Sequence, residues 1–120
     1  GDLITLSDNE IYFHSRVENQ IKLNGVRIEI NEIENALSKC LNNTLAIVVP
    51  IKTDGNKIVL SAFINCNRRK NEFLFQNFIK YLDSAFFPKS ILYSNTIPRL
   101  SNGKVNLKFI KERLIRISND

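Results

Sequence analysis

The residue best suited to chemistry in this 120-residue chain is Lys104, which directly follows Asn102-Gly103. Glycine lets the backbone turn tightly, and lysine carries a compact positive charge on a flexible stem. A lysine at the tip of such a loop could reach a phosphate group and offset the negative charge that develops as a phosphoryl bond breaks. Most Asn-Gly-Lys triplets are ordinary surface turns, so the triplet alone leaves a purely structural interpretation open.

A second group of candidate residues lies between residues 20 and 34, where a glycine and several charged residues occur in and between two short runs that contain apolar residues. Residues 21–23 and 26–30 alternate apolar and polar types, and Asn24-Gly25 between them is typical of a tight turn. The sequence therefore predicts a two-stranded ribbon that leads into a helix. Such a ribbon explains the apolar positions, but it does not explain the set Gly25-Val26-Arg27-Ile28-Glu29.

A small sheet with about three helices is expected to position these residues. Apolar runs predict three strands, at 45–51, 58–64 and 91–93. Apolar periodicity predicts three helices, over 31–43, 71–83 and 107–117. A short hairpin, at 3–6 and 11–14, precedes them. The predicted fold class is α+β, with a small central antiparallel sheet.

Some residues have predicted structural roles. Asn31 is placed to cap the first helix, with Glu34 three residues later as in a capping box. Pro50 indicates an edge or bulge position in its strand, and Asn106 is a possible cap for the last helix. The predicted core stripe of the second helix is Phe75, Phe78, Ile79 and Leu82. The inward residues predicted for the last helix are Leu107, Ile110 and Leu114.

Composition limits the classes of function. Lys and Arg total 17 against 12 Asp and Glu, and the net charge of +5 favours an anionic partner, with a solvated basic surface as an equal alternative. No basic run is interleaved with aromatic residues, which argues against nucleic acid as a partner. One His and two widely spaced Cys predict no metal site. No apolar run is long enough to cross a membrane.

Three segments resemble motifs of the adenylate-forming enzymes, which include acyl-CoA synthetases, adenylation domains of nonribosomal peptide synthetases and D-alanine–carrier protein ligases. Residues 15–34 are similar to Gly-Arg-x-Asp-x-Gln-Ile/Val-Lys-…-Gly-x-Arg-Ile-Glu-…-Glu-Ile-Glu. Residues 97–106 resemble the closing Leu-Pro-…-Asn-Gly-Lys-Val-Asp-Arg motif. Gly1-Asp2-Leu3 resembles the Thr-Gly-Asp that precedes the family's linker. The motifs follow the family's order, and together they cover essentially the whole chain.

In this family two half-reactions share one site. A carboxylate attacks ATP to give an acyl-adenylate and pyrophosphate; a lid then rotates about a hinge, and a thiol takes the acyl group. The resemblance implies that residues 1–14 end a large N-terminal domain, residues 15–19 form the hinge linker and residues 20–120 form the C-terminal lid subdomain. The chain begins at Gly1 without an initiator Met or a leader, and we expect it to be a piece of a longer, cytoplasmic protein.

The resemblance also implies roles in the first, adenylating pose. Lys104 would contact the carboxylate and phosphate oxygens. Asp2 would bind the ribose hydroxyls, and Arg16 would also contact the nucleotide. Glu18 falls at the position of the family's hinge acid.

A different part of the chain is implied in the second, thioester-forming pose. Gly25, with Arg27 nearby, would lie on the loop that approaches the pantetheine thiol, where a residue without a side chain allows close passage. The chain departs from the family at Ser15, which replaces Gly, at Glu18, which replaces Asp, and at Asn106-Leu107, which replace Asp-Arg. Glu18 keeps the charge but changes its reach, so the hinge assignment rests on a less complete match than Lys104.

Two functions are open at this point. The first is the C-terminal lid of a carboxylate-activating ligase. Its Gln-Ile-Lys and Arg-Ile-Glu segments resemble the amino-acid-activating branch more than the acyl-CoA branch. Residues 50–52, followed by a short turn and residues 62–64, resemble D-alanine–carrier protein ligases in particular. The lid function implies ATP and Mg²⁺, bound mainly by the large domain, and a phosphopantetheine or CoA thiol as acceptor. Its partners would be the N-terminal domain and a carrier protein or CoA, and the chain alone should be inactive. The second is a non-catalytic module that docks an acidic carrier protein, which the charge suits and Lys104 argues against.

Overall fold

A computed structural model of the chain describes residues 20–23, 25–67 and 71–118; the hairpin predicted at 3–14 lies outside these ranges. The strands of the described part are β1 (Gln20–Leu23), β2 (Val26–Glu29), β3 (Ala46–Thr53), β4 (Lys57–Ile64) and β5 (Ser90–Tyr93). Its α-helices are α1 (Ile30–Cys40), α2 (Asn71–Phe78) and α3 (Leu107–Ser118). The predicted α+β class, with three helices beside small sheets, is confirmed.

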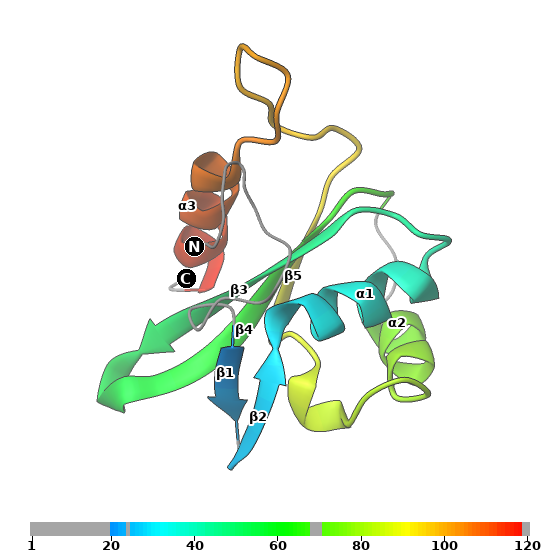
Figure 1. Cartoon of the computed structure of the whole chain (residues 1–120), viewed down its shortest axis with the longest axis vertical. Coiled ribbons are helices and arrows are strands. Elements are labelled where there is room, and N and C mark those ends of the chain that lie inside the picture. Colours follow the sequence, from blue (N-terminus) through cyan, green and yellow to red (C-terminus); the bar gives the residue numbers. More distant parts are fainter. Residues whose placement is uncertain (1–19, 24, 68–70, 119–120) are drawn as a thin grey trace, which may run out of the picture.

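The strands form two sheets (Figure 1). The ribbon β1–β2 is antiparallel, as predicted, and the larger sheet has the order β3-β4-β5 with β3 and β4 antiparallel. The third strand differs from the prediction, because β5 pairs parallel to β4 and the sheet is therefore mixed. Parallel neighbours need a crossover connection, and the chain between β4 and β5 passes through α2. Pro50 lies on β3, which is an edge strand as predicted.

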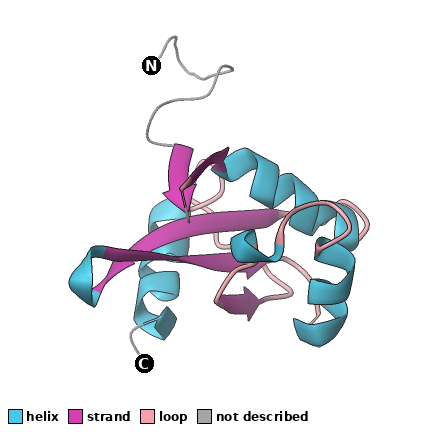
Figure 2. Cartoon of the chain, turned by 90° about the horizontal axis from the view of Figure 1, so that it is seen from below, coloured by secondary structure: helices cyan, strands magenta, loops and turns pink. Residues whose placement is uncertain are grey.

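Both faces of the larger sheet are apolar, and helices cover both (Figure 2). Along β3, Ala46 and Val48 belong to a core shared with α1 and α2, whereas Ile47 and Val49 belong to a second core shared with α3. This assignment follows from the alternation of side chains along a strand. Burial on both faces explains why β3 and β4 read as nearly continuous apolar runs in the sequence.

Helix α2 is shorter than the sequence predicted. It ends at Phe78 rather than Asp83, and the following turn is tightened by a bond from the Tyr81 amide to the Phe78 carbonyl at 2.9 Å. As a result Ile79 is 43% exposed, and Leu74 is buried beside Phe78. The predicted core stripe of this helix was therefore wrong at Ile79, because the helix does not continue far enough to keep it on the inner face.

Helix α3 agrees better with the prediction. Ile110 and Leu114 are buried, and the Asn106 side chain accepts a bond at 3.1 Å from the amide three residues later, as a cap does. Leu107 is 50% exposed, contrary to the prediction. Val105, in the preceding loop, packs against the second core instead.

The capping box predicted at the start of α1 is wrong. The helix begins at Ile30, before Asn31, and its N-cap residue Glu29 makes no side-chain capping bond. Glu34 instead accepts a hydrogen bond from the backbone amide of Val48 at 2.9 Å. Because β3 is an edge strand, its outward amides have no strand partner, and the Glu34 carboxylate satisfies one of them.

Burial makes the Glu34 side chain an unusually weak acid. Desolvation raises the pKa of Glu34 from 4.5 to about 7, although the bond from Val48 acts in the opposite direction. In the unfolded chain the carboxyl ionises at its ordinary pKa, so the folded state binds the proton more tightly than the unfolded state. The stability that this group contributes is therefore present below pH 4.5 and is lost as the pH rises to about 7.

Replacing Glu34 with Gln should remove this loss, because the amide oxygen can accept the Val48 bond without a charge. We expect Glu34→Gln to be more stable than the parent chain by about 2 kcal/mol at pH 8, and by much less at pH 5, in urea unfolding. Glu32→Gln, at an exposed position of the same helix, is the matched control. A stability difference between Glu34→Gln and the parent that does not change with pH would contradict this prediction.

Candidate functional site

Lys104 lies on a short hairpin between β5 and α3. Figure 1 shows this segment in orange, projecting from the body of the molecule. The Leu100 amide donates to the Lys104 carbonyl at 2.7 Å, and the Gly103 amide donates to the Leu100 carbonyl at 2.9 Å. Gly103 has φ of +91°. A turn of this kind followed by a left-handed glycine is a three-residue hairpin loop, which fixes the position of Lys104.

Two side chains hold the peptide group between Gly103 and Lys104. Arg99 Nη1 donates to the Gly103 carbonyl at 2.9 Å, and the Lys104 amide donates to Asn102 Oδ1 at 3.0 Å. The backbone of Lys104 is thus hydrogen-bonded through both its amide and its carbonyl, whereas the residue is exposed. A fixed backbone with an exposed side chain suits a lysine that must reach into a neighbouring site.

The hairpin and α3 together form a basic surface. Residues 99–116 include six Lys or Arg residues and a single acid, Glu112. All six cations are exposed. Their field favours an anionic ligand or partner at this end of the molecule.

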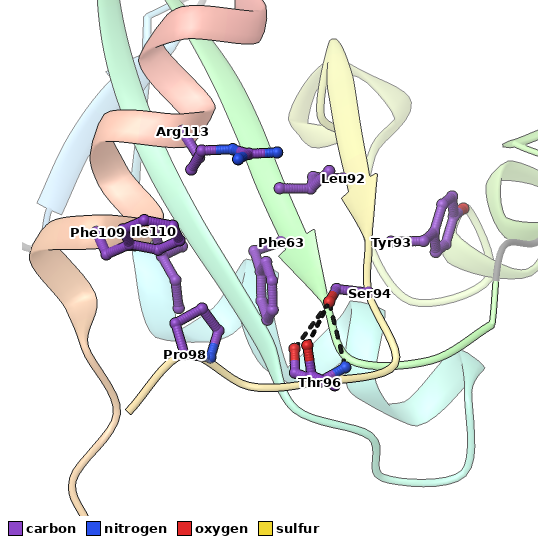
Figure 3. Close-up of a pocket in the computed structure, with 9 residues that line it drawn as sticks. All are labelled: Phe63, Leu92, Tyr93, Ser94, Thr96, Pro98, Phe109, Ile110 and Arg113. Atoms are coloured by element: carbon purple, nitrogen blue, oxygen red, sulfur yellow. Dashed lines mark hydrogen bonds between the residues drawn. The ribbon is translucent and has the colours of Figure 1, made fainter. Parts of the chain in front are cut away.

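A hollow of about 280 Å³ lies at the base of the hairpin, between β5, α3 and the loop that joins them (Figure 3). Its lining includes Phe63 and Ile110, both almost fully buried. Arg113 also lines it, with its guanidinium 6.0 Å from the centre of the Phe109 ring. The lining contains one cation and no acid, so the hollow extends the basic character of the hairpin to its root.

The tip of the β1–β2 ribbon has the predicted tight turn. Gly25 has φ of +82°, and a Cβ there would meet no atom within 4 Å. Arg27 Nη1 donates to Gln20 Oε1 at 3.0 Å across the ribbon, and Lys22 is the cross-strand partner of Arg27. Like charges opposite each other are unfavourable, so an anion beside this ribbon would be stabilising.

The structure does not bring all predicted site residues together. In Figure 1 the hairpin that carries Lys104 is at the top, and the ribbon tip that carries Gly25 is at the bottom, with the larger sheet between them. The remaining predictions, for Asp2, Arg16 and Glu18, lie outside the described residues.

Sequence reasoning missed the contribution of Arg99 and Asn102. An Asn side chain that accepts from the amide two residues on is ordinary turn behaviour, so the Asn-Gly pair could have suggested the role of Asn102. Arg99 could have been found only after the turn type was assigned, because its bond depends on pairing across the hairpin. Arg113 lines the hollow through the packing of α3 on the sheet, and no local signal in the sequence indicates this.

Residues 20–118, apart from the two gaps, contain no group of three or more His, Cys, Asp or Glu that could hold a metal ion. No helix in the same part of the chain is long and apolar enough to cross a membrane. Cys40 and Cys66 form no disulfide with each other.

Comparison with curated proteins finds relatives over most of this chain. Bacitracin synthase 2 from Bacillus licheniformis is 36% identical over 115 residues, which cover 93% of this chain and 4% of the relative. The D-alanine–D-alanyl carrier protein ligase of Bacillus cytotoxicus is 31% identical over 115 residues, which cover 90% of this chain and 23% of the relative. The chain therefore spans less than a quarter of the length of either protein. No family model matches the chain.

Comparison with solved structures also finds a nonribosomal peptide synthetase and acyl-CoA synthetases. A four-domain nonribosomal peptide synthetase, solved with AMP and glycine bound, superposes with a TM-score of 0.62 at 28% identity, over 79% of this chain and 7% of that one. A fatty acyl-CoA synthetase from Mycobacterium tuberculosis superposes with a TM-score of 0.67 at 17% identity, over 85% of this chain and 21% of that one, and shows the shared fold. The chain is a homologue of the adenylate-forming enzymes and corresponds to one short segment of them.

Proposed function

We propose that this chain is the C-terminal lid of an ATP-dependent adenylate-forming ligase, with residues 1–14 ending the large domain, residues 15–19 as the hinge linker and residues 20–120 as the lid. The ligase would activate a carboxylate, for which we propose an amino acid, and pass it to a thiol. The observation that carries the proposal is the braced hairpin, which presents an exposed Lys104 on a fixed backbone. The relatives that match most of this chain support it.

In the first half-reaction a carboxylate oxygen attacks the α-phosphorus of ATP, and the bond to pyrophosphate breaks. We assign Lys104 Nζ to the carboxylate and phosphate oxygens, where its charge offsets the negative charge that develops. Asp2 is assigned to the ribose hydroxyls and Arg16 to the nucleotide. Mg²⁺ and most contacts to ATP belong to the large domain in this proposal.

In the second half-reaction a thiol sulfur attacks the acyl carbon, and AMP leaves. We assign the ribbon tip at Gly25 to this pose, because a residue without a side chain lets the pantetheine arm pass closely. Lys22 and Arg27, opposite each other on the ribbon, would gain from a phosphate group of CoA or of a carrier protein's phosphopantetheine. Because the ribbon tip and the Lys104 hairpin lie at opposite ends of the lid, rotation about a hinge near Glu18 would exchange them.

Replacing Lys104 with Ala in the full-length ligase should lower ATP–pyrophosphate exchange by about a hundredfold or more, because a group that stabilises transition-state charge is lost. Transfer from a preformed acyl-adenylate to the thiol should stay near the parent rate, because the second pose does not use Lys104. Lys89→Ala, at an exposed position outside the basic surface, is the control. Unchanged exchange in Lys104→Ala would remove the catalytic role and favour a module that only docks a carrier protein.

Replacing Gly25 with Ala should slow thioester formation by about tenfold and leave pyrophosphate exchange intact, because the methyl group obstructs the pantetheine arm. A Cβ at this position meets no atom within 4 Å, so an internal clash cannot cause the loss. Gly55→Ala is the matched control, since Gly55 has φ of +80° and equally free surroundings. Equal losses in both variants would mean that backbone strain, rather than the thiol approach, is responsible.

The 120-residue chain alone should form no acyl-adenylate from ATP and any amino acid, because most of the ATP and carboxylate contacts are assigned to the large domain. Trapping of acyl-adenylates with hydroxylamine measures this directly. Hydroxamate formation by the purified chain, above that of a heat-denatured sample, would contradict the proposed division of the site.

A further inference from the structure

The peptide group between Gly103 and Lys104 is closely restrained, although both residues are exposed. Its carbonyl accepts the bond from Arg99 Nη1 at 2.9 Å, and its amide donates to Asn102 Oδ1 at 3.0 Å. Both partners are side chains of the hairpin itself. An exposed peptide group in an ordinary turn can leave these two positions to water, so the pair of side-chain bonds calls for an explanation.

The restraint matters because the backbone at Gly103 could otherwise change conformation easily. Its φ of +91° lies in a region that side chains disfavour, and glycine changes backbone conformation at little steric cost. A Cβ at this position would meet no atom within 4 Å, so packing does not oppose such a change. Rotation of the Gly103–Lys104 peptide plane would alter the direction in which the Lys104 side chain leaves the backbone. The bonds from Arg99 and to Asn102 oppose that rotation.

We propose that Arg99 is a positioning residue, which together with Asn102 fixes the Gly103–Lys104 peptide plane and so aims Lys104 Nζ. The inference rests on the catalytic role proposed for Lys104. Arg99 is suited to the task because its backbone is already held by the bridge to Val105. Its planar guanidinium also loses less conformational freedom for each hydrogen bond than a lysine does.

If Arg99 instead bound the nucleotide directly, its removal would have a different kinetic effect. A residue that binds ATP in both ground state and transition state raises KM when removed, whereas a residue that aims a catalytic group lowers kcat. The hydrogen bond of Arg99 to its own hairpin favours the second behaviour, since Nη1 of the guanidinium already donates to the Gly103 carbonyl.

Pyrophosphate exchange by the full-length ligase separates these roles. Arg99→Ala should lower kcat about fivefold to tenfold, the scale of one ordinary hydrogen bond, because the bond is exposed to solvent; the KM for ATP should be unchanged. Arg99→Lys, which can still donate one bond to the Gly103 carbonyl, should restore part of the loss. Asn102→Ala should resemble Arg99→Ala, and Asn102→Asp, which keeps an acceptor oxygen, should resemble the parent. Lys89→Ala, at an exposed position just before β5 and outside the basic surface, is the control.

Hydrogen exchange of the Lys104 amide, measured by NMR on the 120-residue chain, gives a readout that does not depend on activity. It should quicken about tenfold in Asn102→Ala and about fivefold in Arg99→Ala, and stay unchanged in Lys89→Ala. Parent-like kcat in Arg99→Ala, beside a large loss in Lys104→Ala, would overturn the positioning role and leave the proposed function standing. A raised KM for ATP with parent-like kcat would also overturn it. An unaffected Lys104→Ala would overturn both proposals.

Discussion

The need to cover both apolar faces of one three-stranded sheet is the constraint on which the rest of the structure depends. Strands β3 and β4 alternate their side chains between two cores, and neither core can form without its helices. Each Leu, Ile or Phe that is fully buried contributes about 2 kcal/mol, so exposure of either face would be costly. The chain meets the requirement by placing α1 and α2 on one face and α3 on the other.

This arrangement also determines where the two candidate functional segments lie. The β1–β2 ribbon leads directly into α1, on one face, whereas the Lys104 hairpin leads directly into α3, on the other. Helix α3 is tied to the sheet by a chain of hydroxyl groups: Ser61, which is fully buried, is 2.9 Å from Ser90 Oγ, and Ser90 Oγ is 3.2 Å from Ser118 Oγ. Because a packed helix follows each segment, each tip has a fixed base.

Much of the fold could be predicted from the sequence, because apolar periodicity is a local signal. The ribbon, the strands on either side of Gly55 and the cap at Asn106 are as expected. The failures have tertiary causes. Glu34 fits a capping box locally, but an unpaired amide at Val48 on an edge strand takes its carboxylate instead.

The direction of β5 could not be predicted either, because the sequence of a four-residue strand does not indicate whether it pairs parallel or antiparallel to its neighbour. At the candidate site, the turn that carries Lys104 could be predicted from the Asn102-Gly103 pair. The bond from Arg99 could not, because it depends on the geometry of the turn.

We propose above all that Lys104 acts in the adenylating pose and that the ribbon tip acts only in the second pose. A structure of the full-length ligase with a non-reactive acyl-adenylate analogue tests it most directly. The measured quantity is the distance from Lys104 Nζ to the phosphate and carboxyl oxygens of the analogue. We expect this distance to be about 3 Å, with the ribbon tip at Gly25 away from the analogue. A structure with another cation at those oxygens, and with Lys104 in solvent, would contradict the account.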